Sequence, residues 1–64
     1  MNKEEIIISK LSRIVSICDH IDNVCSEIKK NFIVEDLDLH IEEIEYSLEK
    51  ITINLNMIQQ EVEK

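Results

Sequence analysis

Apolar residues recur in alternating steps of four and three through almost the whole chain. Such a repeat places a continuous apolar stripe along one side of an α-helix, and it is typical of helices that pack lengthwise against other helices. The first series is Ile7, Leu11, Ile14, Cys18, Ile21, Cys25, Ile28 and Phe32, and the second is Leu37, Ile41, Ile44, Leu48, Ile51, Leu55, Ile58 and Val62. The spacing therefore predicts two long amphipathic helices, over about residues 3–31 and 37–63.

The predicted link between these helices, at about residues 32–36, is short, which makes antiparallel neighbours the natural topology. Gly and Pro are absent from the sequence, so the strongest helix breakers are missing. Asn2, followed by Glu5, is suited to cap the first helix, and Asp36 or Glu35 the second. We therefore predict an all-α fold, a single antiparallel two-helix coiled-coil hairpin over residues 1–64.

The apolar stripe of the first helix is wider than one neighbouring helix can cover. With Leu11 and Ile41 taken as heptad position a, both series occupy positions a and d, and the first helix is also apolar at the flanking e and g positions. A chain of 64 residues is also short for a single stable core. We predict further assembly, either as a dimer that forms a four-helix bundle or with a helical partner. The predicted oligomer interface comprises Ile8, Val15, Ile17, Val24, Cys18 and Cys25.

The two cysteines belong to the apolar series of the first helix. They lie seven residues apart, about 10.5 Å along a helix, which is beyond the reach of a disulfide within the chain. We interpret Cys18 and Cys25 as reduced core thiols. If two first helices crossed antiparallel near Ile21, Cys18 of one chain would lie near Cys25 of the other.

The second helix also carries apolar residues on its back, away from the predicted seam. Leu39, Tyr46 and Ile53 repeat every seven residues at position f, and Met57 lies one turn beyond Ile53. A helix with two apolar sides usually contacts two things. We predict that Leu39, Tyr46, Ile53 and Met57 form a ridge that binds a protein partner. Self-association through the same residues, or scattered surface hydrophobes, are the alternatives.

Acidic residues dominate the middle of the chain. The net charge is −7, and residues 35–49 contain seven acidic residues and no basic ones. Such a segment repels a phosphate backbone, so nucleic-acid binding is disfavoured. The segment is most simply a solvated helix face, although it offers an acidic mimic of nucleic acid as an alternative.

Catalytic and metal-binding patterns find little support in the sequence. His20 and His40 fall in different predicted helices, without an arrangement of nucleophile and acid that spacing would bring together. Both apolar seams lack the inward-facing Glu and His of bundle metal sites. We expect no enzymatic activity, metal, cofactor or small-molecule ligand. No apolar run approaches the length of a membrane span, and Ile6 to Ile8 is too short for the apolar region of a signal peptide, so we expect a cytoplasmic protein.

In length and heptad layout, the chain resembles the Rop family of small plasmid-encoded RNA-binding proteins, whose hairpins pair into four-helix bundles. It is also similar in size and pattern to the two-helix co-chaperones of type III secretion needle subunits. Neither resemblance carries a motif that assigns residue roles. We predict a small non-enzymatic interaction module, such as an adaptor, co-chaperone or inhibitor. A purely structural homo-oligomer, an acidic nucleic-acid mimic and a Rop-like RNA binder are the alternatives.

Overall fold

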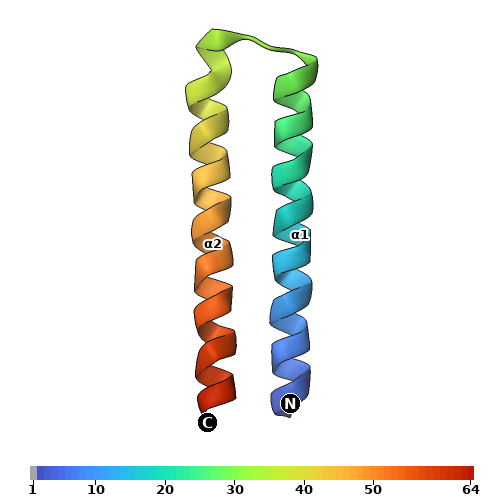
Figure 1. Ribbon diagram of the computed structural model, residues 1–64, viewed down its shortest axis with the longest axis vertical. Coiled ribbons are helices and arrows are strands. Elements are labelled where there is room, and N and C mark those ends of the chain that lie inside the picture. The colour runs from blue at the N-terminus through green and yellow to red at the C-terminus, as the bar shows by residue number, and fades with distance from the viewer. Residues whose placement is uncertain (1) are drawn as a thin grey trace.

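The computed structural model describes residues 2–64 and consists of two long antiparallel helices that pack side by side (Figure 1). Helix α1 spans Lys3–Lys30 and helix α2 spans Leu37–Glu63. A single 3-10 turn, η1 (Val34–Asp36), precedes α2. Within residues 2–64 the structure has no strand. The predicted all-α hairpin is therefore confirmed, and α1 ends one residue before its predicted end.

Helix α1 begins with the cap that the sequence predicts. The Asn2 side chain accepts a hydrogen bond from the backbone N–H of Glu5, with an oxygen–nitrogen distance of 2.8 Å. This bond satisfies one of the backbone donors that the first helical turn leaves without a partner. Glu4 and Glu5 in the first turn, with Lys29 and Lys30 in the last, also complement the helix dipole.

Helix α2 begins differently from the prediction. The Asp36 side chain makes no capping hydrogen bond, because Asp36 has helical dihedral angles (φ −92°, ψ −7°) instead of the extended conformation of a cap. The preceding 3-10 turn already leads into the helix, and the N–H of Leu37 donates to the carbonyl of Val34. The turn thus takes the place of a side-chain cap.

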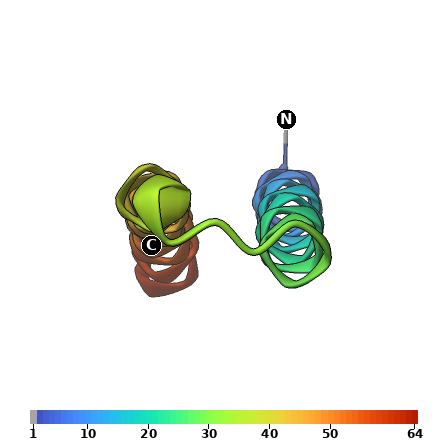
Figure 2. The ribbon, with the colours of Figure 1, turned by 90° about the horizontal axis from the view of Figure 1, so that it is seen from above.

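The hairpin is a single layer with almost no interior. Its extents are 46 × 15 × 12 Å, and Figure 2, viewed along the helices, shows no other element on either side of the pair. Among the described residues, Val24 is the one apolar side chain that is buried, with 8% of its surface exposed. Folded domains normally bury an apolar face between at least two layers. This hairpin leaves most of its apolar residues open to solvent.

The helices face each other through positions d and g, which differs from the predicted a and d seam. The d residues, such as Ile14, Ile21, Ile44 and Ile51, are half-buried as predicted. The a residues are exposed instead, and they are Leu11, Cys18, Cys25, Phe32, Ile41, Leu48, Leu55 and Val62. Each helix is therefore turned about its own axis relative to the prediction.

The residues at position g favour this turn in α1 and tolerate it in α2. In α1 they include Ile17 and Val24, whereas the corresponding a positions hold Cys18 and Cys25, so turning α1 toward g buries larger apolar side chains. In α2, position g holds Ser47, 6% exposed, and Asn54, 7% exposed. Both bond to the backbone carbonyl one turn earlier in their own helix, which limits the cost of burying them.

No helix within residues 2–64 is long and apolar enough to cross a membrane.

Candidate interaction surfaces

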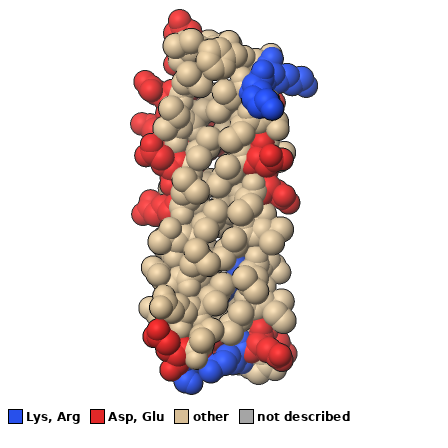
Figure 3. All heavy atoms as spheres, viewed as in Figure 1, with Lys and Arg blue, Asp and Glu red and all other residues tan. Residues whose placement is uncertain are grey.

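One side of the hairpin is apolar from end to end. It consists of the exposed a residues within the two helices, with two e residues along the α1 edge. We call it the broad face, and its residues are Ile8, Leu11, Val15, Cys18, Cys25, Ile41, Leu48, Leu55 and Val62. In an antiparallel hairpin, equivalent heptad positions of the two helices lie on the same side of the pair. Figure 3 shows a face on which uncharged surface runs over both helices, with charged groups at its edges and ends.

The exposure on the broad face is large for such residues. Leu48 is 51% exposed, while the adjacent Ser47 is buried. A helix pair that buries a serine and exposes the leucine beside it has not covered its most hydrophobic surface. Large exposed apolar patches are typical of interaction sites, so the broad face is a candidate for one.

The predicted oligomer-interface residues divide between two places. Ile8, Val15, Cys18 and Cys25 are exposed on the broad face, where another chain can contact them. Val24 is buried and Ile17 is half-buried between α1 and α2. These last two already have their neighbours within the hairpin, because position g faces the seam. Both cysteines are free thiols.

The predicted α2 ridge is exposed as a second apolar surface. Leu39 is 68% exposed, and Tyr46, Ile53 and Met57 are also exposed. Helical spacing places the ridge on the other side of α2 from the broad face. The Lys50 ammonium lies 4.6 Å from the centre of the Tyr46 ring, so part of the ridge is covered by a cation. The ridge is narrower than the broad face and comes from one helix alone.

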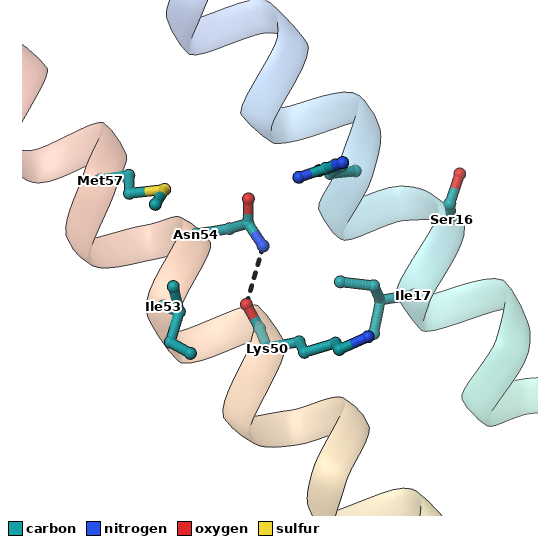
Figure 4. Close-up of a pocket in the computed structure, with 7 residues that line it drawn as sticks. Ser16, Ile17, Lys50, Ile53, Asn54 and Met57 are labelled. Carbon is teal, nitrogen blue, oxygen red and sulfur yellow. Dashed lines mark hydrogen bonds between the residues drawn. The ribbon is translucent and has the colours of Figure 1, made fainter.

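Beside the ridge, a shallow groove of ≈ 370 Å³ runs between the helices. Figure 4 shows Ile53, Asn54 and Met57 of α2 on one side of it, with Ser16 and Ile17 of α1 on the other. The Asn54 amide nitrogen donates to the Lys50 carbonyl at 2.8 Å. The Asn54 side-chain oxygen is buried and has no hydrogen-bond partner, which costs stability.

His20 and Glu43 form the one ion pair between the two helices in the described part of the chain, with Nε2 and Oε1 3.0 Å apart. Their side chains are 52% and 46% exposed, so water and salt weaken the attraction. We predict that Glu43→Gln lowers the free energy of unfolding by less than about 1 kcal/mol. Urea denaturation followed by circular dichroism measures this, and Glu42→Gln, outside the pair, is the control. A larger loss in Glu43→Gln alone would contradict the assignment of a weak surface pair.

Sequence reasoning missed three groups. It did not anticipate the burial of Ser47 and Asn54, or the exposed apolar tip formed by Phe32, Ile33 and Val34. Serine and asparagine on a helix flank read as solvent-facing, and only the rotation of α2 buries them. The tip had a signal, since three consecutive apolar residues occupy a predicted loop.

The described residues, 2–64, contain no group of three or more His, Cys, Asp or Glu side chains arranged to hold a metal ion. No family model, curated protein or solved structure matches the chain.

Proposed function

We propose that this chain is a non-enzymatic interaction module, a small adaptor, co-chaperone or inhibitor that acts by binding protein through apolar helix faces. The observation that carries the proposal is the broad face, which leaves Leu48, Leu55 and their neighbours about half exposed beside buried polar residues. Large apolar faces on small chains are maintained for contact with another protein surface. The shallow grooves are open to solvent and offer no enclosed site for a small substrate.

Two surfaces on opposite sides suit a module that makes two contacts. The broad face supports self-association, and the α2 ridge supports recognition of a different protein by a helix lying in a groove. A tyrosine with a polar tip is a favourable anchor in such a contact. The measurement that tests the proposal is the native mass of the complex purified from its source. A single 7.5 kDa chain would contradict it, whereas a larger complex supports it.

For the ridge, we predict that Tyr46→Glu and Ile53→Glu abolish binding of a different protein while the helical content stays unchanged. Both side chains are exposed in the hairpin, so a charge there disturbs the surface and not the packing of α1 on α2. Circular dichroism measures helicity, and the composition of the purified native complex measures partner binding. Gln60→Glu, at the same heptad position beyond Ile53, is the control. Unfolding of the variants would assign the ridge to the oligomer interface instead.

A purely structural homo-oligomer is the second candidate, favoured by the breadth of the broad face compared with the ridge. In that case the native complex contains this chain alone, and the ridge variants retain its mass.

A further inference from the structure

We propose that the broad face is covered by a second copy of this chain, packed antiparallel so that the loop of each hairpin lies over the chain termini of the other. This inference rests on the proposed function as a protein-binding module, and it names the partner and its orientation. It follows from the rotation of the helices, the exposed area and the distribution of charge.

Each helix is turned about its own axis as it would be in a bundle where it has two neighbouring helices. In a four-helix bundle each helix has one neighbour in its own layer and one in the opposite layer, and the core lies diagonally between them. Positions d and g face the neighbouring helix within this hairpin, so position a faces outward from the layer. The diagonal between these two directions points between positions a and d, which together hold the apolar series of each helix. The a and d residues thus converge when a second layer covers the broad face.

The exposed area also matches one additional layer. A compact monomer of 7.5 kDa exposes about 4,250 Å², whereas this hairpin exposes 5095 Å². The excess of about 850 Å² is close to the roughly 800 Å² that each partner contributes to a standard interface.

Charge selects the orientation of the second copy. The loop half of the hairpin, residues 18–49, contains ten acidic and two basic residues, whereas the remaining residues contain four acidic and five basic ones. The halves therefore carry −8 and +1. Two copies with their loops at the same end would place −8 against −8. In the antiparallel arrangement −8 lies against +1, and the two acidic halves are separated along a molecule 46 Å long, which exceeds the screening length of about 8–10 Å.

The edge of α2 beside the broad face shows the same division. Its loop half carries only acids at the exposed e and b positions, which are Asp38, Glu42, Glu45 and Glu49. Its other half carries Thr52, Asn56 and Gln59 there, with Glu63 at the end of the helix. Figure 3 shows acidic groups along the upper half of this edge of α2 and again at its lower end. In the antiparallel pair, α2 lies against α2 of the second copy. The neutral hydrogen-bond donors of one copy then face the carboxylates of the other.

The antiparallel arrangement also fixes which residues meet at the two-fold axis. Overlap is greatest when the axis crosses the midpoints of α1 (Lys3–Lys30) and α2 (Leu37–Glu63). The a residues nearest these midpoints are Cys18 and Leu48, which lie at similar heights because Ile17 and Ser47 line the same groove. Cys18 thus faces Cys18 of the second copy, within the range of a disulfide. With both loops at the same end, the two Cys18 residues lie on diagonal helices, beyond that range.

The experiment is a thiol cross-link in the intact chain. Sedimentation equilibrium of the reduced protein should give twice the 7.5 kDa mass of the chain. The protein is then oxidised with glutathione disulfide, so that two Cys18 thiols form one disulfide and the oxidant is reduced to two glutathione molecules. Mass spectrometry of the non-reduced digest identifies the link. We expect Cys18 to link to Cys18 at least about ten-fold faster than Cys25 links to Cys25, because held thiols react at a high effective concentration.

Cys18 and Cys25 are matched controls, since both are exposed on the same face. Cys25→Ser should keep the cross-link, and Cys18→Ser should lose it while remaining dimeric before oxidation. Equal linking of both cysteines indicates random collision and overturns the proposal. A dimer linked between Cys18 and Cys25 overturns the position of the two-fold axis, because it places the axis near Ile21. A dimer that is not linked at all overturns the orientation. A monomer in solution overturns self-association, yet it leaves the proposed function intact if the native complex contains a different protein.

Discussion

Leu48→Glu is expected to dissociate the protein and to unfold it, whereas Leu39→Glu leaves both mass and helicity unchanged. Leu48 lies at the centre of the broad face and Leu39 lies on the α2 ridge, and both are at least half exposed in the isolated hairpin. If nothing covered either surface, the two substitutions would have similar small effects. When a second copy covers the broad face, the carboxylate introduced at position 48 is buried next to the same carboxylate of the second copy. Burying unpaired charges costs several kcal/mol.

Sedimentation equilibrium and thermal unfolding followed by circular dichroism measure this difference. We expect Leu48→Glu to lose about 3 kcal/mol or more of stability, which is a large part of the total for a small assembly. The unfolding temperature of the unmodified chain should also rise with protein concentration, because dissociation accompanies unfolding. Equal tolerance of both glutamates, together with a concentration-independent unfolding temperature, would show that the broad face stays uncovered.

Asn54→Leu is expected to stabilise the protein by about 1–2 kcal/mol. Asn54 is 7% exposed, and its side-chain oxygen is buried without a hydrogen-bond partner. Leucine removes that unpaired acceptor and adds an apolar contact to Ile17 across the groove. The groove has a volume of ≈ 370 Å³, which accommodates the branched side chain. The lost bond from Asn54 to the Lys50 carbonyl costs little, since that carbonyl lies within the helical backbone ladder.

Urea denaturation at one fixed protein concentration measures the effect of Asn54→Leu. Asn56→Leu is the control, because Asn56 is exposed and surface substitutions usually change stability by less than about 0.5 kcal/mol. Destabilisation by Asn54→Leu alone would mean that the Asn54 oxygen does have a partner in solution.

The existence and approximate limits of both helices follow from local information. The heptad spacing depends only on the order of apolar residues in the sequence. The cap at Asn2 depends only on Glu5, three residues on, whose backbone N–H donates a hydrogen bond to the Asn2 side chain. The start of α2 could not be predicted in the same way. At Asp36, the competition between a side-chain cap and a 3-10 turn depends on how the loop crosses from one helix to the other.

The α2 ridge and the wide apolar stripe of the first helix were both predicted from periodicity, because residues seven apart share one side of a helix. Their roles in packing were harder to assign. Cys18 and Val24 flank the same stripe of α1, yet Val24 is buried in the hairpin and Cys18 is exposed. Their spacing along the helix does not predict which of the two is buried. Their burial depends on the size of each side chain and on the residue that it meets on α2.

The amino-acid sequence by itself determined two amphipathic helices, their antiparallel pairing and the set of residues on each stripe, because these depend on helical period and loop length. Only the tertiary structure decided how each helix is turned about its axis. That turn balances the burial of Ile17 and Val24 against the burial of Ser47 and Asn54, and no single helix contains both sides of this balance. The result is the exposed broad face, because a helix that directs positions d and g toward its one neighbour directs position a outward from the layer.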